Sequence, residues 1–270
     1  MPVLGICIPT YNRKDLVIPL LETILAAKDL PIEVCVHDDG STDGTHEALC
    51  LLAGKDDRLR VSTGANSGRA AAVLAATGNA TARFLMLFDD DDIINMENLR
   101  AAVARCEEGV PPGVAGFIYQ MDFESGKQWE RFPIERSNFL ALRADYRVIG
   151  DKKEIVLGSL LKAAAPSGAF RRSPTSLSWA RIAQAHDAIC VNLPLGTKRY
   201  LAGGLSSDIT KIKRVNAPPM AMLYLEHIKG FARRRYSSPR FFGKAVLGLF
   251  FYGLIAALRY RPSRTRPAQA

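Results

Sequence analysis

The chain has 270 residues, of which 48% are hydrophobic, and its mean hydropathy is +0.01. This length and composition support a full hydrophobic core, which excludes a disordered chain and indicates one domain with an appendage, or at most two domains. The formal net charge is +9, but no acidic residue follows Glu226, whereas ten Lys and Arg residues do. Residues 1–228 carry 26 basic and 27 acidic side chains, so the basic character belongs to the tail.

The cysteines and the first residues bear on the cellular compartment. The five cysteines form no Cys-x-x-Cys pair, and Cys7 and Cys35 lie in apolar runs where a thiol packs as a small hydrophobe. This usage is typical of a reducing compartment. Residues 1–6 contain neither a cationic region nor a long apolar stretch, so we expect no signal peptide and a cytoplasmic protein.

Short apolar strands alternate with longer helical patterns along the first hundred residues. This alternation predicts an α/β fold with a mixed, mostly parallel sheet flanked by helices. We expect helices at 15–27, 44–52, 68–76 and 96–107, and strands at 3–9, 32–36, 59–62 and 83–88. Further along, 116–123 and 127–132 resemble two strands around Ser125-Gly126, which would give the sheet a mixed edge.

Polar side chains follow three of these predicted strands, and ligands of open α/β sheets collect at the carboxyl ends of strands. The first strand runs into Pro9-Thr10-Tyr11-Asn12-Arg13, and the second into Asp38-Asp39-Gly40-Ser41-Thr42-Asp43-Gly44. Between them and the fourth strand, Asn66-Ser67-Gly68-Arg69 opens a predicted helix. A helix amino terminus beside an arginine favours an anion.

The fourth strand ends in four consecutive aspartates, Asp89 to Asp92. Carboxylates this close repel one another unless a cation lies among them, and a hard divalent ion with oxygen ligands is a natural partner. Asp89 and Asp91 would share one face of an extended chain. For an isolated aspartate run, a solvated acidic turn would be the alternative. Together, the four polar segments could hold a base, a ribose, a diphosphate and a cation.

The order of these segments and the residues in them resemble those of the family-2 glycosyltransferases of the GT-A fold. The match is specific over residues 1–100. The family's Pro-x-Tyr-Asn stands here as Pro9-Thr10-Tyr11-Asn12, and its Asp-Asp-Gly-Ser-x-Asp as Asp38-Asp39-Gly40-Ser41-Thr42-Asp43. Its Asn-x-Gly stands as Asn66-Ser67-Gly68, and its Asp-x-Asp-Asp as Asp89-Asp90-Asp91-Asp92.

The resemblance implies a role for each matched position. Asp39 would accept a hydrogen bond from the nucleotide base, Asp89 and Asp90 would face the ribose and the sugar, and Asp91 would hold Mg²⁺ or Mn²⁺ between the two phosphates. The full set of donor-binding residues would be Pro9, Thr10, Tyr11, Arg13, Asp39, Gly68, Arg69, Asp89 and Asp90. Asp38 and Asp43 have an alternative role as turn formers, which we favour for Asp43.

An inverting transferase also needs a general base, usually a carboxylate from the second half of the chain. The segments 150–154, 174–179 and 200–206 resemble a subgroup that acts on cell-surface polysaccharides, in which Glu would follow Pro174. This chain has Thr175, whose hydroxyl is no base near neutral pH. Glu154, Asp151 and Asp187 are the substitute candidates, and we select Glu154 as catalytic. His186, near the end of a predicted helix over 175–186, could also titrate but is more simply a favourable charge there.

The tail contains an apolar segment, 241–258, in which Lys244 is the single charged residue. Eighteen residues at about 1.5 Å each are at the short limit for a bilayer core of roughly 30 Å, and arginines on both sides give no orientation. We expect residues 230–266 to lie in or dip into the anionic cytoplasmic leaflet. A helix packed on the core or on a dimer partner is the alternative, and a nucleic-acid partner is not expected.

The resulting hypothesis has a GT-A-like domain over 1–228, with a donor half (1–110) and an acceptor half (111–228), and a basic, apolar tail over 229–270. Its function would be metal-dependent, inverting transfer of a sugar from a nucleotide-diphosphate donor to a lipid-linked oligosaccharide or polysaccharide acceptor, at the inner face of the membrane. Transfer onto a polyprenyl phosphate, or a non-catalytic nucleotide-sugar-binding scaffold suggested by Thr175, are the alternatives. A dehydrogenase is not expected, because the first strand is followed by Pro-Thr-Tyr-Asn and not by the glycine fingerprint of dinucleotide-binding proteins.

Overall fold

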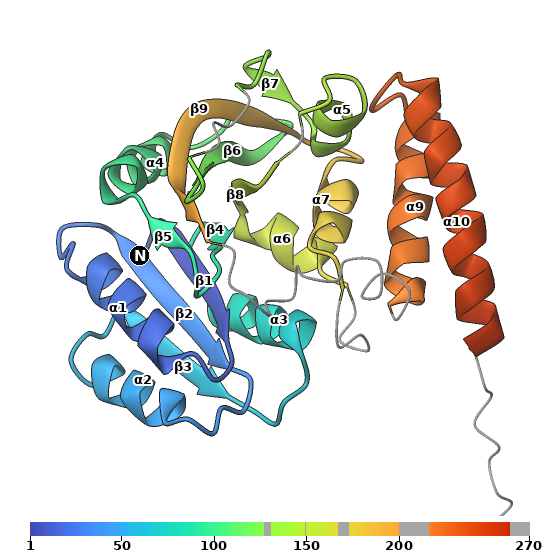
Figure 1. Ribbon diagram of the computed structural model, residues 1–270. Helices are drawn as coiled ribbons and strands as arrows, with labels where there is room; N and C mark the ends of the chain where they lie inside the picture. Colours follow the sequence, from blue (N-terminus) through green and yellow to red (C-terminus); the bar gives the residue numbers. More distant parts are fainter. Residues whose placement is uncertain (127–130, 149, 167–172, 200–215, 260–270) are drawn as a thin grey trace, which may run out of the picture.

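The computed structural model describes residues 1–126, 131–148, 150–166, 173–199 and 216–259. Its centre is one mixed sheet with the strand order β3-β2-β1-β4-β8-β6-β9-β5, and β7 pairs with β9 (Figure 1). The first four strands in this order are mutually parallel and comprise β1 (Leu4–Thr10), β2 (Ile32–Asp38), β3 (Leu59–Thr63) and β4 (Phe84–Leu87). The remainder comprises β5 (Ile93–Ile94), β6 (Val114–Phe123), β7 (Arg136–Ser137), β8 (Lys152–Leu157) and β9 (Asp187–Lys198). The α/β fold with a mostly parallel sheet is confirmed.

Helices cover both faces of this sheet, because the central strands carry apolar side chains on both sides. One face packs on α1 (Lys14–Leu25), α2 (Thr45–Ala53) and α4 (Met96–Glu108), and shares a core with Ile6, Ile8 and Phe84. The other face, which carries Cys7 and Leu85, packs on α3 (Arg69–Asn79), α6 (Gly158–Ala164) and α7 (Ser176–Ile182). The short helix α5 (Phe139–Ala144) joins this side through the stacking of Phe139 on Trp179.

Two expectations for the second half were wrong. The partner of β6 is not a hairpin strand over 127–132, because β6 pairs antiparallel with β8 and parallel with β9. Residues 127–130 lie outside the described part, and 131–132 are not in a strand. The helix predicted over 175–186 ends at Ile182: the amide of His186 still bonds to the Ile182 carbonyl, and Asp187 already begins β9.

The tail forms two helices that lie side by side, α9 (Ala217–Ala232) and α10 (Pro239–Arg259) (Figure 1). Stacked rings join them, with centroids 5.6 Å apart for Tyr224 and Tyr252 and 4.5 Å apart for Phe231 and Phe242. Helix α9 also packs on α7, so the predicted boundary at residue 228 falls inside a helix that belongs to both parts. The tail arginines beyond residue 259 and the segment 200–206 lie outside the described residues.

The outer face of α10 is apolar and uncovered. Within the described residues, one helix, Pro239–Leu258, is both long enough and apolar enough to cross a membrane, and 6% of its most apolar window is buried. The exposed side chains recur at helical spacing on one face, and their exposed fractions are 71% for Leu247, 73% for Phe250, 46% for Phe251, 50% for Leu254 and 77% for Leu258. A stripe of this size is unusual on a surface that faces only water.

Candidate donor-binding and active site

The carboxyl ends of β1, β2 and β4 bring the predicted donor-binding segments together at one edge of the sheet. Thr10, the last residue of β1, is buried, and its hydroxyl donates to Asp90 Oδ2 at 2.7 Å. In the sheet register, Thr10 is also paired with Asp38, and its carbonyl accepts the amide of Asp39 at 2.9 Å. The last residue of the first strand thus connects the loop after β2 to the aspartates after β4, which are eighty residues away in the chain.

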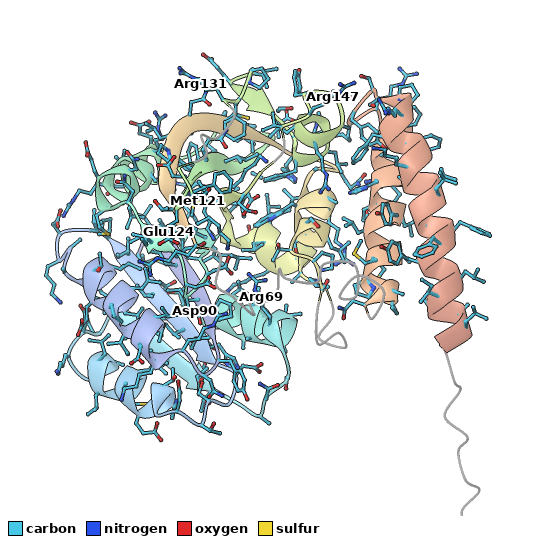
Figure 2. All side chains as sticks on the ribbon, viewed as in Figure 1. Arg69, Asp90, Met121, Glu124, Arg131 and Arg147 are labelled. Atoms are coloured by element: carbon cyan, nitrogen blue, oxygen red, sulfur yellow. The ribbon has the colours of Figure 1, made fainter. Side chains whose placement is uncertain are left out.

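Two arginines from the predicted donor half contact the aspartate run. Arg13 Nη1 lies 2.7 Å from Asp90 Oδ1 and 2.8 Å from Asp91 Oδ2. Arg69, the first residue of α3, donates to Asp89 Oδ1. Figure 2 labels Arg69 at the start of α3 and Asp90, the next residue after its partner Asp89. Both arginines were expected at a donor site, and the structure places both guanidinium groups on the carboxylates.

Two lysines from the predicted acceptor half complete the cluster, and neither was identified as a site residue from the sequence. Lys153 on β8 has its ammonium 3.3 Å from Asp89 Oδ2 and 3.0 Å from Asp92 Oδ2. Lys198, the last residue of β9, lies 3.1 Å from Asp89 Oδ2 and 3.3 Å from Asp92 Oδ1. The position of Lys153 beside the candidate base Glu154 is a weak indication that it belongs to the site. Nothing in the sequence around Lys198 associates it with an aspartate more than a hundred residues away.

The ion pairs lower the pKa values of the carboxyl groups in the cluster, whereas burial raises them. Burial alone would raise the pKa of Asp89, but Lys153, Arg69 and Lys198 hold it well below its usual range. Burial raises the pKa values of Asp90 and Asp92, and their cationic neighbours offset this only in part. Asp89 therefore stays ionised in its cationic surroundings.

Asp39 occupies a different environment from the one expected for a free base-binding group. Its buried carboxylate accepts the backbone amides of Ser67 and Gly68, each at 2.8 Å. Gly68 has φ 92°, a conformation that favours glycine, and it allows these two amides to converge just before α3. Each carboxylate oxygen has a second lone pair, so Asp39 keeps the capacity to accept from a ligand while it fixes the start of α3.

The other residues of the first two motifs shape the loop between β2 and α2. Asn12, at φ 50°, accepts the amide of Thr42 at 2.7 Å. Asp38 accepts from Ser41, and Asp43 accepts the amide of Thr45 at 3.0 Å, which confirms the turn-forming role favoured for Asp43. Pro9 is buried within β1, and Tyr11 is 44% exposed at the same edge, where its ring is open to a ligand.

The chemistry of Asp91 fits a divalent cation. Its side chain is 15% exposed, and its ion pair with Arg13 uses one of its two oxygens. No group of three or more His, Cys, Asp and Glu side chains forms a metal site in the described ranges. Mg²⁺ commonly binds proteins through one or two carboxylates and completes its octahedral ligand set with substrate phosphates and water. A single accessible carboxylate beside a diphosphate site is sufficient for that arrangement.

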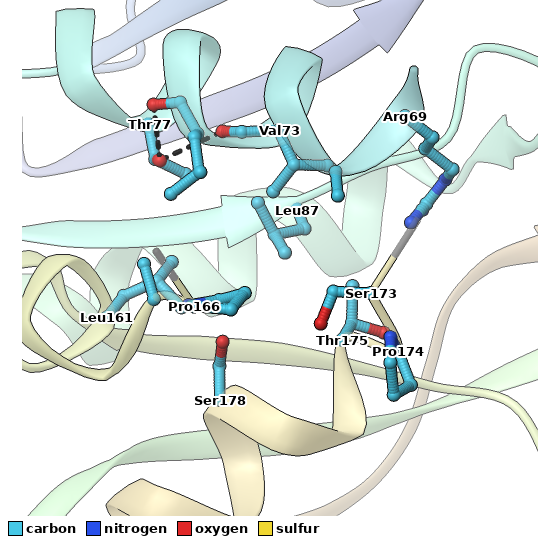
Figure 3. A pocket seen from close by; sticks show the side chains of 13 residues that line it. Arg69, Val73, Thr77, Leu87, Leu161, Pro166, Ser173, Pro174, Thr175 and Ser178 are labelled. Atoms are coloured by element: carbon cyan, nitrogen blue, oxygen red, sulfur yellow. Dashed lines mark hydrogen bonds between the residues drawn. The ribbon is translucent and has the colours of Figure 1, made fainter. Parts of the chain in front are cut away.

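A largely apolar pocket lies beside Arg69, between α3 and the start of α7 (Figure 3). Val73, Leu87 and Leu161 form its apolar walls, and Thr175 lies on the opposite side. The hydroxyl of Ser173, two residues before Thr175, is buried and has no hydrogen-bond partner within the described residues. The position where a base was expected therefore lies near the predicted diphosphate site, but it holds a hydroxyl group.

Glu154 reaches the same side of the sheet from β8. In the β4–β8 register, Met86 is paired with Ile155 and Leu85 with Val156, so Glu154 follows beside Leu87, which lines the pocket. Side chains alternate along a strand, so Glu154 shares the face of Val156 while Lys153 points to the opposite one. Burial raises the pKa of Glu154 to about 7, although Lys152 and Lys153 oppose the shift. A pKa near 7 is suited to a general base at neutral pH.

The positions of the remaining base candidates, Asp187, Asp151 and His186, are less suited to a general base. Asp187 is paired with Arg235 at 2.6 Å and with Arg136 at 3.2 Å, and so ties the α9–α10 connection to β9. Asp151 is exposed at the start of the β8 segment, and His186 lies beyond the end of α7. Among these candidates, Glu154 is the carboxyl group whose position and raised pKa both fit a base.

Comparison with known proteins identifies the family of the chain. A family model described as glycosyl transferase family 2 matches residues 5–163. The chain is 33% identical over 94 residues to chondroitin synthase of Pasteurella multocida, which covers 35% of this chain and 10% of that protein. It is 28% identical over 140 residues to GalNAc(5)-diNAcBac-PP-undecaprenol beta-1,3-glucosyltransferase of Campylobacter jejuni, covering 51% of this chain and 45% of that protein. The matches thus span less than half of either relative.

Solved structures share the fold over most of the chain. Staphylococcus aureus TarS 1-349 in complex with UDP-GlcNAc superposes with a TM-score of 0.64 at 22% identity, over 97% of this chain and 74% of that one. The mannosyltransferase PcManGT of Pyrobaculum calidifontis, in complex with GDP-Man and Mn2+, superposes with a TM-score of 0.56 at 18% identity. The match covers 95% of this chain and 78% of that one. With more than half of its residues inside the family model and this fold around them, the chain belongs to glycosyltransferase family 2, with the GT-A architecture.

Proposed function

We propose that this protein transfers a sugar, with inversion, from a nucleotide-diphosphate donor to a lipid-linked saccharide acceptor. The observation that carries the proposal is the convergence of Thr10, Arg13, Arg69 and the aspartates 89–92 at the carboxyl edge of β1, β2 and β4. Ligands of open α/β sheets bind at this edge. The donors named for two structural neighbours, UDP-GlcNAc and GDP-Man, support a nucleotide sugar as the ligand class.

Each residue of the edge has a proposed task. Thr10, Tyr11 and Asp39 bound the site of the nucleotide base, and Asp89 and Asp90 face the ribose and the sugar. Pro9 and Gly68 shape the backbone around the donor, while Arg13 and Arg69 supply positive charge beside the diphosphate. Asp91 is the ligand for Mg²⁺ or Mn²⁺, which would neutralise the charge that develops on the departing diphosphate.

Glu154 is the proposed general base. Glycosyl transfer needs the proton of the acceptor hydroxyl to be removed as the new bond forms, and a carboxylate with a pKa of about 7 is ionised in a useful fraction at neutral pH. Its place on β8, next to Leu87 and on the pocket side of the sheet, supports this role. The acceptor would then enter between α3 and α7, through the pocket beside Arg69 at the donor edge.

The tail is proposed to hold the protein on the anionic cytoplasmic leaflet, at the inner face of the cell membrane. The exposed stripe on α10 supports this, since transfer of its five side chains from water would contribute about 6 kcal/mol. Exposed cations in the α9–α10 connection and the first turns of α10, including Arg233, Arg234, Arg240 and Lys244, would favour anionic lipid. A lipid-linked acceptor is supported by the same surface and by the relative whose name includes PP-undecaprenol.

A donor panel tests the proposed activity. Purified full-length protein is incubated with UDP- and GDP-sugars and Mn²⁺, and release of the nucleoside diphosphate is followed with and without lipid-linked saccharide. We expect turnover with one donor class, lost in Asp91→Asn and kept in Asp57→Asn, an exposed aspartate at the opposite end of the sheet. Binding of a donor without any turnover would favour the scaffold alternative, and binding of none would refute the proposal.

Vesicle flotation tests the membrane surface. Leu247, Phe250 and Leu254 are replaced together by serine, which removes about 4 kcal/mol of apolar transfer free energy. We expect a several-hundred-fold weaker partition, roughly, into vesicles containing anionic lipid, whereas Leu51→Ser, at an equally exposed leucine on α2, leaves it unchanged. If the triple variant binds vesicles as well as the parent and instead turns a dimer into a monomer, the stripe is a subunit interface.

A further inference from the structure

The charges around the aspartate run are unevenly distributed. Arg69, Lys153 and Lys198 surround Asp89 and Asp92, so three cations face two carboxylates on this side of the cluster. On the other side, Arg13 alone faces Asp90 and Asp91. The first side has a surplus of one positive charge and the second a surplus of one negative charge. Such a polarised cluster presents one face to an anion and the other to a cation.

The two lysines on the positive side differ in their freedom to move. Lys153 is 8% exposed, and its ammonium also lies 4.7 Å from the centre of the Phe88 ring, so it is enclosed on several sides. Lys198 is 16% exposed and ends strand β9. The contacts of both lysines with Asp89 and Asp92 are 3.0 to 3.4 Å long, which exceeds the roughly 2.7 to 2.9 Å of well-formed charge-assisted hydrogen bonds, so the greater exposure of Lys198 and its place at the end of a strand distinguish it from Lys153.

Asp89 connects these lysines to the accessible surface. Its side chain is 24% exposed, which is more than for any of the three following aspartates, and both lysines contact its Oδ2 while Arg69 contacts its Oδ1. An anion that approaches Arg69 at this point also approaches Lys198. Because Lys153 keeps its contact with Asp92 at 3.0 Å, the aspartates remain compensated if Lys198 turns toward the anion.

We propose that Lys198 binds the terminal phosphate of the donor's diphosphate and compensates the negative charge left on it when the sugar departs, while Lys153 remains the structural counterion of Asp89 and Asp92. This inference rests on the proposed function and adds a residue to it. The bond between the sugar and the diphosphate breaks with both electrons going to the phosphate oxygen. The departing nucleotide therefore gains one negative charge, which the ammonium of Lys198 would offset.

Affinity measurements with the free nucleotide and with the donor separate this role from a structural one. UDP has one more negative charge on its terminal phosphate than a UDP-sugar, or GDP than a GDP-sugar, so it resembles the leaving group. Calorimetry on full-length protein with Mn²⁺ is performed for the parent, Lys198→Met, Lys153→Met and Lys55→Met, the last being an exposed lysine at the far end of the sheet. We expect Lys198→Met to weaken the binding of the nucleoside diphosphate roughly tenfold more than the binding of the nucleotide sugar.

The control variants should leave the ratio of the two affinities close to that of the parent. Lys153→Met should lower the melting temperature and leave the ratio of the two affinities within about twofold of the parent, as should Lys55→Met, while Lys198→Arg should restore the parent ratio. An unchanged ratio in Lys198→Met would overturn the inference while leaving the proposed function in place. Failure of the parent to bind any nucleotide would instead refute the proposed function.

A second measurement uses the unmodified protein, so it does not depend on the folding of a variant. Lysines are labelled with an amine-reactive reagent and quantified by mass spectrometry with and without saturating nucleoside diphosphate and Mn²⁺. We expect Lys198 to be labelled in the free protein and protected severalfold by the nucleotide, and Lys153 to be labelled poorly in both. Labelling of Lys198 that the bound nucleotide does not change would contradict the inference.

Discussion

Replacement of Glu154 by glutamine should remove activity and stabilise the protein at the same time. The carboxyl group has an ordinary pKa of 4.5 and a folded-state pKa of about 7, because its partly buried position on β8, between β4 and β6, desolvates it. The folded protein therefore binds this proton more tightly than the unfolded chain does. The contribution to stability is fully present below pH 4.5 and is lost as the pH rises through 7.

The size of this effect follows from the two pKa values. Each pKa unit corresponds to about 1.4 kcal/mol, so ionised Glu154 reduces the free energy of unfolding by about 3 kcal/mol at pH 8, and by less than about 1 kcal/mol at pH 5. Glutamine has nearly the same shape and no charge to bury. We expect Glu154→Gln to melt about 6 °C higher than the parent at pH 8 and nearly the same at pH 5.

Calorimetric melting at both pH values is combined with a pH–rate profile of the parent. The rate should fall tenfold per pH unit below about pH 7, as the base becomes protonated, and Glu154→Gln should lose at least about a hundredfold in kcat. Glu22→Gln, on an exposed carboxylate of α1, is the control for both measurements. A Glu154→Gln enzyme that retains its rate would exclude Glu154 as the base. An unchanged melting temperature at pH 8 would show that the group is not desolvated as the structure implies.

Three other substitutions test the packing around the site. A methyl group at Gly116 would overlap the carbonyl oxygen of Ile155 on β8, so Gly116→Ala should cost at least about 2 kcal/mol in chemical denaturation. Gly78→Ala on α3 meets nothing within 4 Å and should instead add about 0.5 to 1 kcal/mol. Asn12→Ala removes the bond to the Thr42 amide and places alanine at φ 50°, so it should displace the neighbouring Tyr11 and raise the donor KM severalfold in steady-state kinetics with kcat nearly unchanged; an unaltered KM would show that this bond does not position the donor-binding residues.

The donor half of the fold could be predicted from sequence because its signals are local. Strands β1 and β4 are apolar on both faces and β2 is largely apolar apart from Glu33 and His37, and each strand leads into the polar residues that the sheet brings to one edge. The order of parallel strands then places Thr10 beside Asp38 and close to Asp90 without further information. Four motifs in one order were sufficient to indicate the fold and to select the edge at which we propose the donor site.

The acceptor half was harder to predict because its signals are distributed over long separations. Strand β8 begins with Lys152, Lys153 and Glu154, and a charged start of this kind does not resemble a central strand until its neighbours β4 and β6 are known. Lys198 meets Asp89 only because β9 runs beside β6 to the same edge. Helix α7 stops early because the chain must turn back to begin β9 at Asp187, a tertiary demand that the helix-favouring residues after Ile182 conceal.

The most direct test of the account is a crystal structure of the full-length protein with Mn²⁺ and the nucleoside diphosphate that it binds best. The account predicts an ion on Asp91, a diphosphate within contact distance of Arg69, and a base beside Asp39 at the carboxyl ends of β1 and β2. A nucleotide bound elsewhere on the molecule, with Asp91 still paired to Arg13 and no ion beside it, would contradict it.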